Sequence, residues 1–151
     1  MISKEHIFID DIIGFFKLKK VKTMSGNCGT FALALAFILK DKGFDTNRIK
    51  IIIASDSGEE EDILRGEPTI YHIFLDIDEE YYLDGEGLHT TAESILDWIQ
   101  MEYGVYNSEA ITFDYSEIES KQLGTVIRSN TNYDKDISDF LYIYQGYLKW
   151  L

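Results

Sequence analysis

Residues 25–39 read SGNCGTFALALAFIL, and this stretch holds the single cysteine of the chain, Cys28. The apolar residues that follow it lie on nearly every side of a helix, which predicts a buried helix. This helix is expected to run from about Cys28 to Lys42, with Gly43 as the residue that ends it. Cys28 is therefore either a small buried residue or a nucleophile at the start of a buried helix.

Composition places the chain among single globular domains. Of its 151 residues 45% are hydrophobic and 14% aromatic, with one proline and no linker-like segment, so residues 1–151 are expected to form one domain. The net charge of −13 argues against a protein that grips nucleic acid over a broad basic face. No apolar run approaches the roughly 18 residues needed to span a bilayer. One cysteine and a start unlike a signal peptide favour a cytoplasmic, reducing compartment.

The order of elements predicts an α+β fold in which helices flank a mostly antiparallel sheet. A capping box at Thr90–Glu93 is expected to open a helix over about 91–103. The acidic segment after Ser55 is typical of a loop. The remaining predicted elements are an amphipathic helix over 4–17, strands over 47–55, 69–77, 81–84 and 110–115, a short helix from Ser116, and a C-terminal helix over 134–150.

The surroundings of Cys28 suit acyl chemistry. A helix start favours a thiolate, because its free N–H groups and partial positive charge stabilise negative charge. Gly26 and Gly29 leave room for a carbonyl to approach the sulfur. The same N–H groups, or the side chain of Asn27, are candidates to hold the oxyanion that forms on attack.

A thiol nucleophile also needs a base and a group that orients the base. His72 interrupts an apolar strand, and Asp84 ends the next predicted strand. Residues directly opposite in an antiparallel pair share a face. Hydrophobic matching, which puts Ile73 and Leu75 on the same face as Tyr81 and Leu83, favours the register that puts His72 and Asp84 together. His89 is an alternative base, placed by the sequence in a glycine-rich loop.

This arrangement resembles the papain-like cysteine superfamily, and within it the NlpC-type peptidase, transglutaminase and arylamine N-acetyltransferase branches. The matching pieces are NCGTFALAL, YHIFLDI and YYLDGEG, within about residues 25–87. The resemblance implies a buried helix carrying Cys28, packed on the sheet, with additional helices after it. It also implies that Cys28 is the nucleophile, His72 the base and Asp84 the group that holds the imidazole. Papain-type members have a Gln shortly before the cysteine, and Asn27 or backbone N–H groups would take its place here.

These residues also have ordinary structural roles. Cys28 would then be a core residue, His72 a buried strand histidine, and Asp84 a turn residue before Gly85. The sequence predicts no cofactor and no metal site, although zinc on Cys28, His72 and a carboxylate stays compatible with it.

Two function classes follow from the sequence. The first is a cysteine hydrolase or acyltransferase acting on an amide or thioester of a protein or peptide: a peptidase, a deamidase or a transglutaminase-like enzyme. The second is a non-catalytic acidic interaction or inhibitor protein, of a kind that suits a phage, which engages a basic or nucleic-acid-binding partner. A papain-like fold used only for binding would combine the two.

Overall fold

The computed structural model describes residues 9–14, 28–105, 108–117, 142 and 145. Residues 9–14 are helical, within the helix predicted over 4–17. Of the C-terminal helix predicted over 134–150, only residues 142 and 145 are described, and both are helical, whereas Asn27 lies outside the described residues. The elements are α2 (Cys28–Asp41), η1 (Thr46–Arg48), β1 (Ile49–Ser55), α3 (Glu60–Leu64), β2 (Ile70–Ile77), β3 (Tyr81–Asp84), β4 (Gly87–His89), α4 (Glu93–Tyr103) and β5 (Glu109–Asp114).

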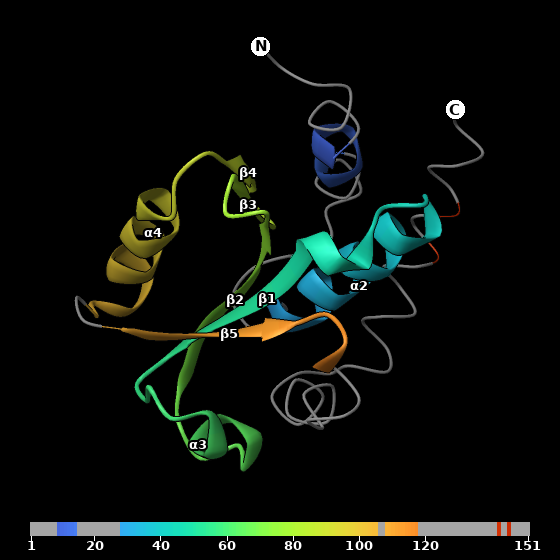
Figure 1. The fold of residues 1–151 in the computed structure, drawn as a ribbon. Coiled ribbons are helices and arrows are strands. Elements are labelled where there is room, and N and C mark those ends of the chain that lie inside the picture. The colour runs from blue at the N-terminus through green and yellow to red at the C-terminus, as the bar shows by residue number, and fades with distance from the viewer. Residues whose placement is uncertain (1–8, 15–27, 106–107, 118–141, 143–144, 146–151) are drawn as a thin grey trace.

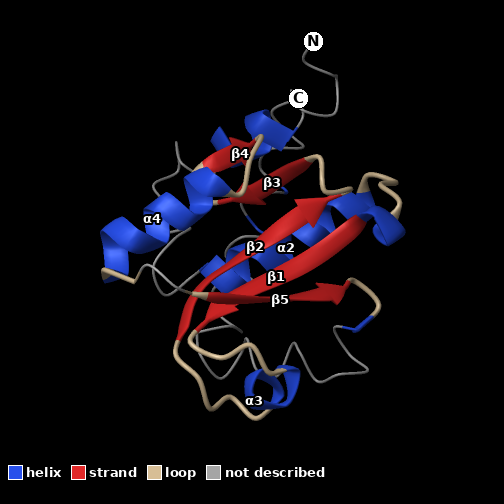
Figure 2. Cartoon of the chain, turned by 60° about the vertical axis from the view of Figure 1, so that its left-hand side comes forward, coloured by secondary structure: helices blue, strands red, loops and turns tan. Residues whose placement is uncertain are grey.

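The five strands form one sheet in the order β4-β3-β2-β1-β5, and every neighbouring pair is antiparallel. Helix α2 covers one face of the sheet and α4 lies at the other face (Figures 1 and 2). The α+β class and the antiparallel sheet predicted from the sequence are therefore confirmed. None of the helices in the described part of the chain is long and apolar enough to cross a membrane.

Helix α2 is the central element of the larger core. It runs from Cys28 to Asp41, one residue short of the predicted end. Gly43 has φ +84°; its N–H donates to the carbonyl of Lys40 at 2.9 Å, and the N–H of Phe44 donates to that of Leu39 at 3.0 Å. These two bonds form a Schellman motif, which requires the left-handed conformation that glycine adopts at little cost.

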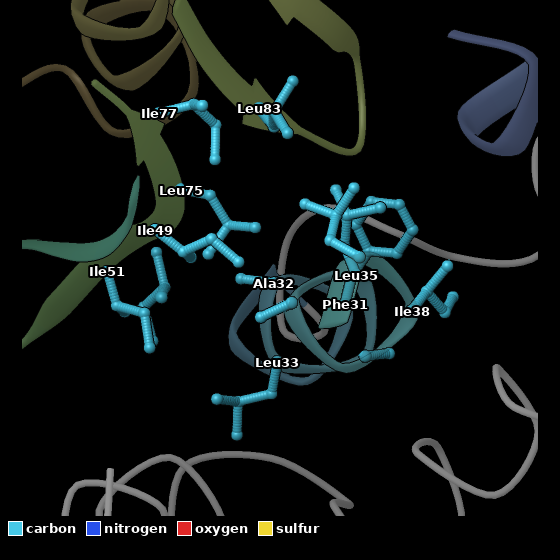
Figure 3. Packing of buried hydrophobic residues seen from close by; sticks show 14 of the residues in the cluster. Phe31, Ala32, Leu33, Leu35, Ile38, Ile49, Ile51, Leu75, Ile77 and Leu83 are labelled. Atoms are coloured by element: carbon cyan, nitrogen blue, oxygen red, sulfur yellow. The ribbon is translucent and has the colours of Figure 1, made fainter. Parts of the chain in front are cut away.

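Two groups of buried side chains lie on the two faces of the sheet. The larger joins α2 and residues 9–14 to the odd-numbered positions of β2, among them Leu75 and Ile77 (Figure 3). The smaller joins Ile95 and Ile99 of α4 to Phe74, Ile52 and Ala54 of the central strands. Strands β1 and β2 are buried on both sides, which explains why both read as nearly continuous apolar runs.

The β2–β3 hairpin has the register that the apolar pattern predicts. Leu75 pairs with Leu83 and Ile77 with Tyr81. The chain reverses through Asp78 and Glu79, which have φ of 58° and 56°. These leucines point into the larger core, so the even-numbered positions of β2 face the other way, toward α4.

Four details differ from the predicted elements. Strand β1 begins at Ile49, because Asp45 accepts a hydrogen bond from the N–H of Asn47 and caps a 3₁₀ turn ahead of it. The acidic segment contains the short helix α3, whose Ile63 is fully buried. The predicted glycine-rich loop contains β4. The predicted capping box is wrong: α4 begins after Ala92, which makes no side-chain cap.

The central position of α2 leads to a stability prediction. Leu35 is fully buried in the larger core, whereas the side chain of Met101 is 85% exposed. Truncation of a buried leucine leaves a cavity, so Leu35→Ala should cost about 2–5 kcal/mol of unfolding free energy. Met101→Ala should stay within about 0.5 kcal/mol of the original chain. Urea denaturation measures both, and equal effects would contradict this packing.

Candidate active site

His72 and Asp84 meet on the face of the sheet that carries α4. The side chains are 0% and 1% exposed, and Nε2 of His72 lies 2.9 Å from Oδ2 of Asp84. The predicted pairing of these two residues is thus present as a buried hydrogen bond between adjacent strands. A buried polar pair is tolerated because each group satisfies the other.

Asp84 accepts hydrogen bonds on both of its oxygens. Oδ1 accepts one from the N–H of Glu86 at 2.9 Å and one from Nε2 of His89 at 2.8 Å. Burial alone would raise the pKa of Asp84, but the hydrogen bonds from His72 and His89 outweigh it and hold that pKa well below its usual range. Asp84 is therefore a carboxylate at neutral pH.

The charge of Asp84 fixes the tautomer of His72. A carboxylate has only acceptors, so Nε2 of His72 must carry a hydrogen and donate it. In the neutral imidazole, Nδ1 is then the basic nitrogen. This atom is buried, and no hydrogen-bond partner for it is found within the described part of the chain. The unpaired position of a buried imidazole is therefore the one that can accept a proton.

Cys28, at the start of α2, contributes to the raised pKa of this imidazole. Burial lowers the pKa of His72, but the hydrogen bond to Asp84 and the nearby side chain of Cys28, with the charges of both, raise it overall to about 9. Nδ1 of His72 has no hydrogen-bond partner within the described residues, so Cys28 lies near the imidazole without a hydrogen bond of ordinary geometry. Nucleophile–base contacts are often longer than ordinary hydrogen bonds before a substrate binds. Asp84 is thus hydrogen-bonded to His72, and Cys28 lies near enough to influence the pKa of this imidazole.

Aromatic rings cover the imidazole on the α4 side. The ring centroid of Trp98 lies 4.6 Å from that of His72, and that of Phe74 lies 5.7 Å away. Tyr103 packs edge-on against Trp98 at 6.0 Å. These rings keep water away from the His72–Asp84 hydrogen bond, and a low local dielectric strengthens it.

The remaining predicted site residues can be placed only in part. Gly29 is buried in the first turn of α2, where backbone N–H groups have no acceptor within the helix. Asn27 lies outside the described residues, so its role stays a prediction. Within the described ranges, no group of three or more His, Cys, Asp and Glu side chains is arranged to hold a metal ion.

His89 is the site residue that the sequence interpretation placed wrongly. It lies in strand β4, opposite Tyr82, and not in a loop. The signal was present: Asp84 and Gly87 flank a two-residue turn, and an apolar–polar alternation follows. Extending the strand pattern across that turn puts His89 on the same face as Asp84 and His72.

The pKa shifts predict how stability depends on pH. Because the pKa of His72 is raised from 6.5 to about 9, its contribution is complete below pH 6.5 and is lost as pH rises through about 9. The stability advantage of the original chain over His72→Gln should therefore shrink by up to about 3 kcal/mol between pH 6 and pH 10. Urea denaturation at several pH values measures this difference. A constant difference would contradict the raised pKa.

Comparison with known proteins identifies no relative of this chain. The chain matches no family model, no curated protein and no solved structure.

Proposed function

We propose that the chain is a papain-like cysteine hydrolase or acyltransferase that acts on an amide or thioester of a protein or peptide. One observation carries the proposal. A buried imidazole donates Nε2–H to a buried carboxylate, and the thiol at the start of a buried helix contributes to its raised pKa. A structural cysteine needs no base beside it, and among the residues that the structure describes Nδ1 of His72 has no hydrogen-bond partner.

In the acylation step, the proton of the Cys28 thiol resides on Nδ1 of His72, because the pKa of this imidazole is raised to about 9. The resulting thiolate attacks the carbonyl carbon of the substrate, and a sulfur–carbon bond forms while the carbonyl oxygen takes the negative charge. Collapse of this tetrahedral intermediate breaks the bond to the leaving amine or thiol. That group leaves with the proton from Nδ1, and Cys28 stays acylated.

In the second step, a water molecule or an acceptor amine attacks the acyl-cysteine. Nδ1 of His72 removes the proton of the attacking group and returns it to the departing sulfur. Water gives hydrolysis or deamidation, and an amine gives acyl transfer. The same three residues support all of these outcomes, because the outcome depends on which groups reach the acyl-enzyme.

Two features of the site stabilise the charges that arise. Asp84 is ionised and buried against His72, so it stabilises the imidazolium that forms when the thiol loses its proton. The N–H of Gly29, in the first turn of α2, belongs to the free donors that can bind the oxyanion. Asn27 would add a side-chain donor at the same end of the helix.

The first test uses the reactivity of the thiol and needs no substrate. Cys28 is the single cysteine, so iodoacetamide labels one position only. Because the thiolate is the nucleophile and His72 accepts its proton, folded His72→Gln should be alkylated at neutral pH about tenfold more slowly than the original chain. Asp84→Asn should slow labelling in the same direction, since an amide cannot stabilise the imidazolium. Mass spectrometry follows the reaction.

The control for this test is the same measurement in denaturant. Without the fold, Cys28 has no imidazole beside it, so all three chains should react at one rate. Equal rates in the folded state as well would mean that His72 does not activate the thiol, and the proposed mechanism would be wrong.

A second test asks for the covalent intermediate. An activated ester such as p-nitrophenyl acetate should release nitrophenolate and leave an acetyl group on Cys28, detected as an added mass. Cys28→Ala should not be acetylated there, and His72→Gln should react at least about tenfold more slowly, because general base catalysis is lost. Acetylation of the folded chain no faster than of the denatured chain would count against acyl chemistry.

A further inference from the structure

His89 provides a second imidazole hydrogen bond to the carboxylate of Asp84. Its Nε2 lies 2.8 Å from Oδ1, while His72 holds Oδ2 at 2.9 Å. The residue comes from β4, where it pairs with Tyr82, so the sheet itself places it beside the end of β3. Its side chain is 17% exposed, compared with 0% for His72. Asp84 therefore lies between a buried imidazole and a partly exposed one.

The hydrogen bonds on the far side of His89 suit either of its protonation states. Nδ1 lies 3.0 Å from the hydroxyl oxygen of Ser94, which in turn lies 3.1 Å from the carbonyl of Thr91. If His89 is charged, Nδ1–H donates to Ser94 and the hydroxyl donates to Thr91. If His89 is neutral, the hydroxyl turns and donates to Nδ1 instead. In both states Nε2 keeps its hydrogen and donates it to Asp84.

We propose that His89 is a positioning residue for the site: it holds the carboxylate of Asp84 in the orientation that presents Oδ2 to His72. Without this bond, Oδ1 would keep the N–H of Glu86, a contact to a neighbouring turn residue that leaves the side chain freer to rotate. The role depends on a hydrogen bond and not on charge, because both protonation states provide the same donor. Its value for catalysis rests on the proposed function, but the positioning itself can be measured without it.

The experiment compares His89→Ala with His89→Gln, which restores a neutral N–H donor. Both are made in a Cys28→Ala background, so that Asp84 remains as the partner that raises the pKa of His72 and thiol chemistry plays no part. NMR titration of the imidazole C–H signals reports the pKa of His72. Its signal is assigned by its loss in His72→Gln, and that of His6 by its loss in His6→Gln.

The expected result is that His89→Ala lowers the pKa of His72 by about one unit or more, because the carboxylate is no longer held against the ring. His89→Gln should keep most of the original value. An unchanged titration in His89→Ala would overturn the proposal. Equal lowering in both variants would also overturn it, since a neutral donor would then not be what matters.

Ser94→Ala is the matched control. It removes the partner of Nδ1 but leaves the Nε2–Asp84 bond, so the titration of His72 should stay as in the parent chain. A lowering of about one unit or more in Ser94→Ala would overturn the proposal, and this holds even if His89→Ala does not fold. Iodoacetamide labelling of the same His89 variants with Cys28 intact separates the two hypotheses. If His72→Gln is labelled as fast as the original chain while the pKa of His72 still falls in His89→Ala, the proposed function fails and the positioning role stands.

Discussion

The structure of the site depends on one buried negative charge, that of Asp84. Taking a carboxylate out of water is costly unless donors replace the lost hydration. Here three donors do so: the imidazoles of His72 and His89 and the backbone N–H of Glu86. Each donor comes from a different segment, so the charge also fixes where β2, the turn after β3, and β4 lie relative to one another. The ionised state of Asp84 then determines that Nε2 of His72 carries a hydrogen, and hence that Nδ1 is the nitrogen able to accept a proton.

The register of the sheet is the constraint that brings these groups together. A shift of one residue between β2 and β3 would turn Asp84 to the face of α2 and remove it from His72. The apolar side chains prevent that shift, because Leu75 and Leu83 would then leave the larger core. Packing on one face of the sheet therefore fixes the relative positions of His72 and Asp84 on the other face. The polar site adds little to the choice of fold, and the fold supplies the alignment that the site needs.

The buried helix and the β2–β3 register could be predicted from the sequence, because they depend on the spacing of apolar residues and on the matching of apolar faces between strands. The apolar run after Cys28 and the alternation in β2 and β3 predict a buried helix and a hairpin register without reference to distant residues. The missed features depend on other forces. Strand β4 has three residues, so its apolar–polar alternation is a weak signal beside the glycines of the turn, and its pairing with β3 stabilises it. The predicted capping box is wrong because α4 begins at Glu93, after Ala92, so Thr90 is not the N-cap and Glu93 is not the third helical residue.

The site also joins the two halves of the core. Cys28 packs against the cluster formed by α2, whereas His72 is covered by Trp98 of α4 on the opposite face. Strand β3 pairs with β2 at Leu75–Ile77, so within the described residues its pairing stops before His72. Beside His72, β2 therefore pairs with β1 alone among the described strands. Under the proposed function, the thiol and the imidazole would come from different layers of the fold, so packing on both faces of the sheet would position them.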